Sequence, residues 1–379
     1  MKTTQKQWIE NTGWRSISSN GIAEKAQAVF LFGERKLLID NERINEVRKF
    51  YPNAHIIGCS TAGEIAGSSV YDDSMIATAV FFEDTPLMFS QTNITNMADT
   101  YQAGQQLAEG LKKDGLVHVF VLSNGLNING SALSKGLRSK LPEGVSVTGG
   151  LAGDQARFEE TLVILDENCG KHTVAAIGLY GNAIKIGYGS QGGRDTFGPD
   201  RLITRSKDNV LFELDNQPAL ELYKTYLGDQ ADGLPATGLL FPLSLSLDGS
   251  NERLVRTILA VDEKDGSMTF AGDIPQGCNA RLMKANFDRL AEGAAVSARD
   301  SQVTGSVKPD LAILISCVGR KLVLKQRIDE EVENVQNVLG SQAALTGFYS
   351  YGEICPVEPQ NKQAELHNQT MTITTFCEE

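Results

Sequence analysis

The sequence has few of the residues that build metal sites and disulfide frameworks. It contains six cysteines and four histidines among 379 residues, and no two cysteines stand at the short spacing of zinc ligands. Scattered cysteines fit a reducing compartment, so we expect a cytoplasmic protein without a disulfide framework. Any imidazole chemistry has to use one of the four histidines, which are His55, His118, His172 and His367.

Long apolar runs and basic clusters are also missing. No segment approaches the roughly 18 apolar residues of a membrane-spanning helix, and the N-terminus has no signal-peptide core. The net charge of −12 argues against nucleic-acid binding, which needs clustered Lys and Arg. What is present, 41% hydrophobic and 22% charged residues, is typical of a soluble globular protein of about two domains.

Three segments repeat one pattern, and we call them the first (28–65), second (118–155) and third (311–354) repeat. Each has a short β-branched or aromatic run, a stretch of helical periodicity, a second apolar run and a final Gly followed by an acid. The pattern predicts strand–helix–strand units and a mixed α/β fold, although any α/β protein shows similar patterns. The closing pairs are Gly63-Glu64, Gly153-Asp154 and Gly352-Glu353.

The segment between the second and third repeats has a different pattern. We expect a helix over 212–228, capped by Asp215 or Asn216 and ended by Gly228, and a hairpin over 252–275. We expect a second helix over 279–301, and in the third repeat a helix over 328–340. These elements predict one domain over 25–210 and another over 211–379.

Several of these segments together resemble a known family. IIGCSTAGEI, VTGGLAGD, LFELDNQPALELYKTYLG, GDIPQGCNARLM, ILISCVGRK, GFYSYGEICP and LHNQTMTITTF are similar, in this order, to the signature segments of FIST proteins. The resemblance covers 25–379 and implies a FIST N domain (25–210) followed by a FIST C domain (211–379), with a ligand crevice between them. It also implies an intracellular sensory protein that is not an enzyme.

The resemblance leaves the ligand open. FIST domains are thought to bind small ligands, with amino acids proposed, and one bacterial branch binds haem b and senses nitric oxide. Proteins of that branch signal to a histidine kinase or to a cyclic-di-GMP enzyme, a diguanylate cyclase or phosphodiesterase. We expect either a haem-based nitric-oxide sensor or a sensor of an amino acid or related metabolite, in both cases with a separate signalling partner.

GCSTAGEI (58–65) also suggests an enzyme, because it places Cys59 and Ser60 after an apolar run. A nucleophile elbow reads G-x-S-x-G, which this stretch does not match, and no histidine is near in sequence to act as a base. Across the repeats only Gly and the acid persist. A hydrolase using Ser60 or Cys59 is therefore the less favoured alternative to a ligand-binding loop.

For ligand binding, we expect residues from both ends of the chain. Glu64 and Glu353 could accept bonds from an ammonium group or only cap neighbouring loops, and Arg320 could hold a carboxylate or a haem propionate. For Cys317 a buried, inert thiol is the alternative. The predicted set is Cys59, Ser60, Thr61, Gly63, Glu64, Ser316, Cys317, Arg320, Tyr349, Tyr351, Gly352, Glu353 and Asn368.

The histidines are expected to play different roles. His118 lies in an alternating strand and is expected in the core, whereas His55 follows a turn and is expected to be exposed. If haem binds, His367 is the first candidate for its axial ligand and His172 the second, because both begin strands after polar turns. A hydrogen-bonding role for His367, such as orienting Glu353, is the alternative.

Two further motifs are not interpreted as functional sites. GYGSQG (187–192) matches G-x-G-x-x-G, but the helix that a dinucleotide site needs does not follow. DEEVE (329–333) is interpreted as the solvated face of a helix.

Overall fold

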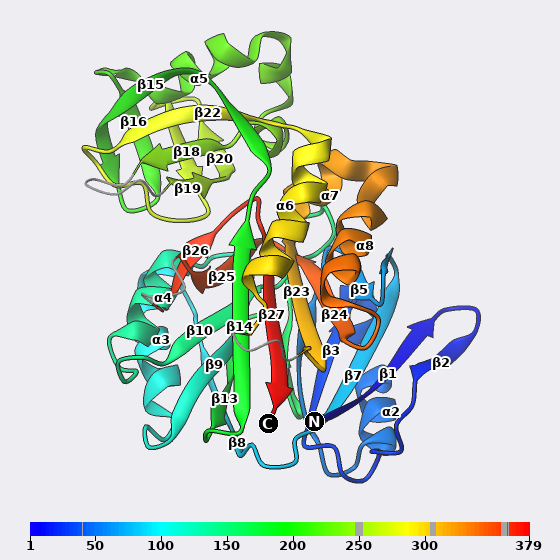
Figure 1. Ribbon diagram of the computed structural model, residues 1–379. Helices are drawn as coiled ribbons and strands as arrows, with labels where there is room; N and C mark the ends of the chain where they lie inside the picture. The colour runs from blue at the N-terminus through cyan, green and yellow to red at the C-terminus, as the bar shows by residue number, and fades with distance from the viewer. Residues whose placement is uncertain (40, 247–252, 304–307, 358–361, 363) are drawn as a thin grey trace.

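The computed structural model has a large body and a smaller lobe (Figure 1). It describes residues 1–39, 41–246, 253–303, 308–357, 362 and 364–379. Residues 194–285 form the lobe, and both chain ends lie in the body, next to each other. No helix of the described chain combines the length and the apolarity needed to cross a bilayer.

Three mixed sheets form the body, and each is built on one parallel strand pair. The pairs are β3 with β4, β9 with β10, and β23 with β24. Each pair belongs to one repeat and is joined through helix, so the predicted strand–helix–strand units are confirmed. Their bounds are β3 (Ala28–Gly33), α1 (Arg35–Leu38), α2 (Glu42–Phe50) and β4 (His55–Ser60); β9 (Leu116–Ser123), α4 (Gly130–Arg138) and β10 (Ser146–Leu151); and β23 (Leu311–Cys317), α7 (Val318–Leu324), α8 (Ile328–Leu339) and β24 (Ala344–Ser350).

Each parallel pair is extended on one side by two antiparallel strands of its own unit. We call the turn around each Gly-acid pair an acid loop. In each unit, a strand that follows the acid loop pairs with the first strand of the parallel pair. A strand that precedes the repeat in sequence pairs with this returning strand. These strands are β7 (Ser74–Phe81) and β1 (Lys2–Ile9), β13 (Thr173–Tyr180) and β8 (Leu87–Asn93), and β27 (Met371–Glu378) and β14 (Ile184–Gln191).

On the other side the repeats exchange strands. β5 (Glu64–Ala66) leaves the first acid loop and pairs with β24, and β25 (Gly352–Pro356) leaves the third loop and pairs with β10. β11 (Val163–Leu165) follows the second loop and pairs with β4. The three sheets are thus interlocked in a cycle. The edge strands are β2 (Gly13–Ser18) and β12 (Asn168–Gly170) in the first sheet, β8 and β26 (Ala364–His367) in the second, and β14 and β6 (Ser69–Tyr71) in the third.

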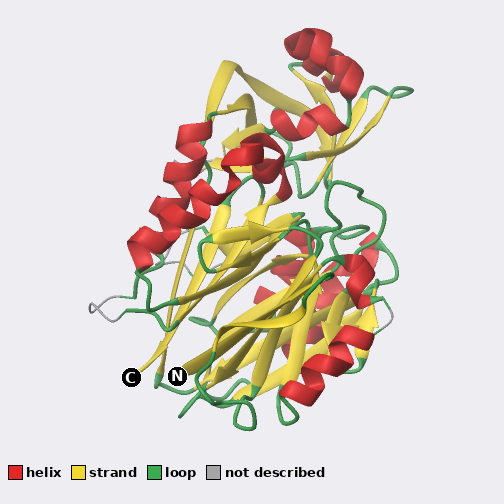
Figure 2. Ribbon diagram, turned by 90° about the vertical axis from the view of Figure 1, so that its right-hand side faces the viewer, coloured by secondary structure: helices red, strands yellow, loops and turns green. Residues whose placement is uncertain are grey.

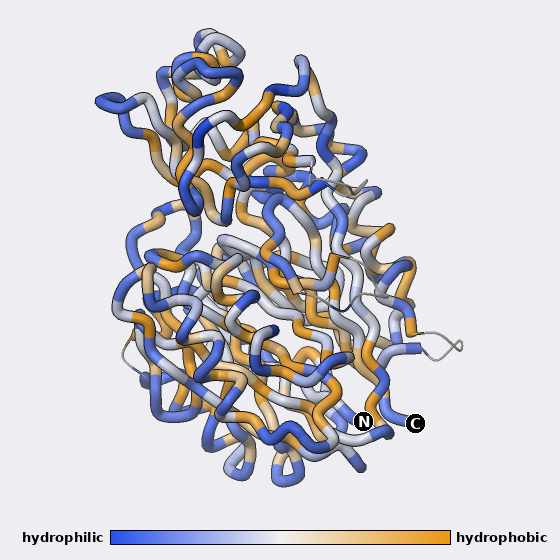
Figure 3. Tube along the Cα trace, turned by 90° about the vertical axis from the view of Figure 1, so that its left-hand side faces the viewer, coloured by the Kyte–Doolittle hydropathy of each residue, from blue (hydrophilic) through white to orange (hydrophobic). Residues whose placement is uncertain are grey.

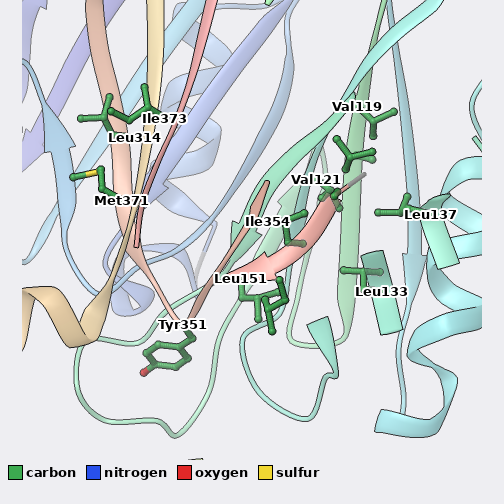
Figure 4. Close-up of a cluster of buried hydrophobic side chains, with 14 of the residues drawn as sticks. Val119, Val121, Leu133, Leu137, Leu151, Leu314, Tyr351, Ile354, Met371 and Ile373 are labelled. Atoms are coloured by element: carbon green, nitrogen blue, oxygen red, sulfur yellow. The ribbon is translucent and has the colours of Figure 1, made fainter. Parts of the chain in front are cut away.

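Apolar side chains of the three sheets meet in the middle of the body. Phe30 and Phe120 pack edge to face at 5.5 Å between ring centroids, and Phe32 lies 4.8 Å from Phe348. Helices cover the outer faces, with α3 (Thr100–Glu109) packed on α4, and α6 (Phe287–Asp300) packed on α8 (Figure 2). Hydrophobic residues accordingly gather along the inner strands (Figure 3). Figure 4 shows buried side chains of the second sheet, of α4 and of the third sheet.

The lobe is an antiparallel β structure inserted between β14 and α6. Its strand order is β19-β18-β22-β15-β16-β21-β20, and only Thr257 separates β19 from β20, so the two ends of this order are joined by the chain. The strands enclose a separate apolar core. The bounds are β15 (Arg194–Lys207), β16 (Val210–Leu214), β17 (Gln217–Pro218), α5 (Ala219–Leu227), β18 (Leu243–Ser246), β19 (Arg253–Arg256), β20 (Ile258–Asp262), β21 (Ser267–Phe270) and β22 (Asn279–Ala285).

Two predicted helices are wrong in their first halves. Residues 210–214 form β16, and Asp215 and Asn216 form a turn with φ of 51° and 62°, so α5 begins only at Ala219. Residues 279–285 form β22, which pairs with β15 and β18, and Asn286 then caps α6 through its side chain. The hairpin turn at 262–267 and the helix that ends before Gly340 are confirmed.

The predicted domain boundary lies inside the lobe, at the start of β16. The third sheet also joins β14 from one predicted domain to β27 from the other. The division into 25–210 and 211–379 therefore stays a prediction about sequence modules, while the spatial units are the body and the lobe.

Candidate functional site

The three acid loops meet at one place in the body. Ser60 Oγ donates a hydrogen bond to the Gly153 carbonyl (2.8 Å), and Ala62 N donates to the Tyr349 carbonyl (2.8 Å). Tyr351 N in turn donates to the carbonyl of Leu151 (3.2 Å). GCSTAGEI and GFYSYGEI, predicted to face each other across a ligand crevice, are therefore in direct contact.

Glu64 and Glu353 are buried and held in the same way. Thr61 and Ser74 donate their hydroxyl protons to Glu64, at 2.5 and 2.8 Å. Ser350 and Thr370 do the same for Glu353, at 2.7 and 2.8 Å. Burial raises the pKa of Glu64 to about 8 and that of Glu353 to about 7. Both carboxyl groups thus accept hydrogen bonds from neighbouring loop residues, which was the alternative to ligand binding in the sequence analysis.

The second loop holds its acid differently. Asp154 is fully buried, and it accepts a hydrogen bond from Arg157 Nε (2.9 Å) and lies 3.1 Å from Arg35 Nε. Two guanidinium groups thus pair with this carboxyl group inside the protein. The acid at the same position of the three repeats is therefore held by hydroxyl groups in the first and third repeats and by arginines in the second.

Among the described residues, neither candidate nucleophile has an activating base. Ser60 Oγ accepts a hydrogen bond from Leu162 N (2.8 Å), in addition to the one it donates to Gly153. Cys59 is fully buried, and burial together with the Glu64 carboxyl raises the pKa of its thiol well above the ordinary value. A catalytic cysteine needs the opposite shift, so the geometry does not favour a hydrolase.

Arg320 is occupied inside the protein. Its guanidinium donates to Glu331 (2.7 and 3.0 Å) and to the carbonyls of Gly192 and Leu290. Glu331 also accepts hydrogen bonds from Ser316 (3.0 Å) and Tyr349 (2.5 Å). The interpretation of DEEVE as a solvated face is therefore wrong for Glu331, which is fully buried.

Cys317 and Gly352 are also buried. The pKa of the Cys317 thiol is raised to about 12 by burial, which indicates an inert thiol. Tyr351 accepts a hydrogen bond from Phe158 N (3.1 Å) and stacks on the Phe158 ring at 4.3 Å. Asn368 Oδ1 accepts from Thr257 N (3.4 Å), in the contact between body and lobe.

The residues predicted for haem do not form a haem pocket. His367 is 9% exposed, its Nε2 lies 3.0 Å from the Cys355 carbonyl, and burial lowers its pKa to about 4. His172 is exposed in a turn. Arg320, predicted to hold a propionate, is paired with Glu331, so these residues do not fit the group. Within the described chain, no three His, Cys, Asp or Glu side chains are grouped as metal ligands.

The other two histidines lie as predicted. His118 is fully buried between Ser146 (2.7 Å) and Thr148 (3.1 Å), whereas His55 is exposed and pairs with Asp166 (2.7 Å).

A pocket of about 530 Å³ lies beside the acid loops, and all three repeats or the segments that follow them contribute to it. Lys321 of α7 donates to the Ala62 carbonyl (2.7 Å) and pairs with Asp72. Asp73 accepts a hydrogen bond from Gln155 (3.0 Å). The lining residues are Ala62, Val70, Asp72, Asp73, Gln155, Ala156, Val318, Lys321, Leu322, Lys325 and Ile328.

The residues predicted from the sequence are neighbours in sequence of the residues that line this pocket. Its described lining contains none of the predicted site residues, but Ala62 lies between Thr61 and Gly63, and Lys321 follows Arg320. Gly63 has φ of 138°, and a Cβ there would lie 2.5 Å from Lys321 Nζ. The glycine thus makes room for the lysine. The adjacent acids Asp72-Asp73 are a local signal in the sequence that could have indicated this surface.

Comparisons with known proteins cover most of the chain. The family model described as the FIST N domain matches residues 27–217, and that of the FIST C domain matches 219–356. No curated protein matches. A solved structure, a cyanuric acid hydrolase from A. caulinodans, is 7% identical and aligns over 94% of this chain and 90% of its own, with a TM-score of 0.35. We draw nothing about function from so distant a likeness.

Proposed function

The chain belongs to the FIST family, and on that premise we propose that it is a sensor whose small ligand binds in the pocket beside Lys321. FIST domains sense small ligands in signal transduction and are sensory rather than catalytic. The buried, unactivated Ser60 and Cys59 agree with a non-enzymatic role. We further propose that the ligand-bound form acts on a separate signalling protein.

The observation that carries the proposal is the composition of the pocket. Val318, Leu322 and Ile328 contribute apolar side chains to the lining, and Asp72, Asp73, Lys321 and Lys325 contribute charges of both signs. Lys325 is exposed and suited to a ligand carboxylate, and Asp73 is suited to an ammonium group. Charges of both signs together with apolar side chains favour an amino acid or a related metabolite.

The proposal is tested by ligand-induced stabilisation. A ligand that binds only the folded protein at 100 times its Kd adds about 2.7 kcal/mol to the free energy of unfolding. We expect at least one free amino acid or related metabolite to raise the unfolding temperature. Leu322→Trp, which fills the pocket, should abolish the shift, and Lys325→Ala should weaken it for ligands with a carboxylate.

Gln326→Leu, an exposed substitution next to Lys325, serves as the control and should leave the shift unchanged. A shift that survives in Leu322→Trp would place the ligand elsewhere. A screen of amino acids and metabolites without any shift would refute this form of the proposal.

The haem form of the sensor is the less favoured version, because His367 and Arg320 already have partners inside the protein. It comes from the family resemblance, together with a histidine kinase or cyclic-di-GMP enzyme as partner. An absorption spectrum of protein produced with haem supplied tests it, since bound haem gives a Soret band that His367→Ala should abolish. Colourless protein that cannot be reconstituted with haem would exclude this version.

A further inference from the structure

The contact between the body and the lobe has an unusual composition. The lobe is covalently joined to the body only by Gly192-Gly193, before β15, and by Asn286, after β22. Between these connections, Arg194 and Arg256 are 7% and 2% exposed. We call the contact around these two arginines the seam.

Among the described residues, the hydrogen bonds of the two arginines go to neutral acceptors. Arg194 donates to Gln369 Oε1 (2.5 Å) and to the carbonyls of Leu239, Leu240 and Gly319. Arg256 donates to backbone carbonyls only, including that of Leu366 in the body (3.0 Å). Burial lowers the pKa of both guanidinium groups to about 10, which reflects the cost of a buried charge.

The turn between β26 and β27 completes the seam. Gln369 Nε2 donates to Thr257 Oγ1 (3.1 Å), at the corner where β19 passes into β20, and to the Leu239 carbonyl (3.2 Å). Asn368 Nδ2 is buried and has no hydrogen-bond partner among the described residues. The buried guanidinium charges and the unpaired amide lower the stability of the docked lobe, whereas the ion pair between Lys135 and Asp273 (2.6 Å) stabilises it.

Helix α7 belongs both to the pocket and to the seam. Val318, Lys321 and Leu322 line the pocket. The carbonyl of Gly319, on the same helix, lies 3.5 Å from Arg194, and a Cβ at Gly319 would lie 2.3 Å from Gln369 Nε2. A shift of α7 by a bound ligand would therefore change the fit between Gly319 and Gln369.

We propose that the lobe (194–285) is the moving part of the sensor, and that α7 transmits occupation of the pocket to the seam and releases the lobe. This inference rests on the proposed function for the pocket, but it requires no particular ligand. A ligand can shift such an equilibrium only through its different affinity for the two arrangements, and contact with α7 provides that difference.

The test measures the distance between lobe and body in the full chain. Spin labels are attached at Lys264→Cys in the lobe and Gln102→Cys on α3, both exposed, with the partly buried Cys169 changed to serine. We expect one short distance for this background. Gly319→Ala and Gln369→Leu, which disturb the seam without lining the pocket, should each add a population at longer distance, whereas the control Gln326→Leu should not.

Leu322→Trp then serves as the probe for an occupied pocket, and it should produce the same longer distance. If both seam variants keep the short distance, the seam is not a switch and the proposal is overturned. If they lengthen it while Leu322→Trp does not, transmission through α7 is refuted. If Gly319→Ala does not fold, Gln369→Leu decides the first question. Absence of any stabilising ligand in the thermal screen would count against the proposed ligand and not against this coupling.

Discussion

The first and third acid loops differ from the second in how they keep a carboxyl group away from water. Glu64 and Glu353 are surrounded by hydroxyl groups, and burial raises their pKa to about 8 and about 7. Asp154 occupies the corresponding position with two arginines. The difference shows that the repeated Gly-acid pair fixes a place in the fold, whereas the neighbours decide whether hydroxyl groups or arginines hold the acid.

Among single substitutions, the largest effect is expected when the ion pairs of the second acid loop are broken. Asp154→Asn removes the negative charge between Arg157 and Arg35 and should lower the free energy of unfolding by about 2–4 kcal/mol. Urea denaturation at pH 7 measures this loss. Glu333→Gln, on the exposed face of α8, is a control that should change little. A loss below about 1 kcal/mol would mean that Asp154 is not the anchor of this loop.

The raised pKa of Glu64 and Glu353 should make the free energy of unfolding depend on pH. Both glutamates rise from an ordinary pKa of 4.5, so between pH 4.5 and about 7 or 8 the folded protein binds protons that the unfolded chain has lost. The free energy of unfolding should therefore fall as the pH rises through this window, by up to about 1.4 kcal/mol per pH unit for each carboxyl group.

Urea titrations from pH 5 to pH 8 measure this slope. The double variant Glu64→Gln, Glu353→Gln should flatten it, whereas Glu333→Gln should leave it unchanged. An unchanged slope in the double variant would show that both glutamates are ionised in the folded protein.

The sequence predicted the repeated units because their signals are local. Apolar runs such as 28–33 and 311–317, and the helical spacing of Val332, Val335 and Leu339, depend only on neighbouring residues. The exchange of β5, β11 and β25 between sheets depends on contacts between distant segments. No periodicity encodes such contacts.

The candidate site was less predictable for the same reason. Glu331 looked like part of a solvated charge run, because its partner Arg320 lies eleven residues away, a spacing that gives no local signal. The pocket likewise combines Asp72, Gln155 and Lys321, which the strand exchange brings together. The predicted residues lie in the acid loops beside this pocket and not in its described lining.

A moderate effect is expected from the hydroxyl groups that hold the neutral acids. Thr61→Val keeps the shape of the side chain but removes the hydrogen bond to Glu64, and Ser350→Ala does the same for Glu353. Each should lower the free energy of unfolding by about 1 kcal/mol, the usual contribution of one hydrogen bond. Equal losses in the urea midpoints would confirm that the two loops are equivalent, and a loss in only one would break the equivalence.

The smallest effect should come from Glu64→Gln at pH 5.5. At this pH the folded carboxyl group is already protonated, because its pKa is about 8. A glutamine keeps the size and an acceptor oxygen for one of the two hydroxyl groups, Thr61 or Ser74. We expect the free energy of unfolding to change by less than about 1 kcal/mol, against the larger loss for Asp154→Asn under the same conditions. A comparable loss in both variants would mean that Glu64 is also an anion, and that the acid loops do not differ in charge.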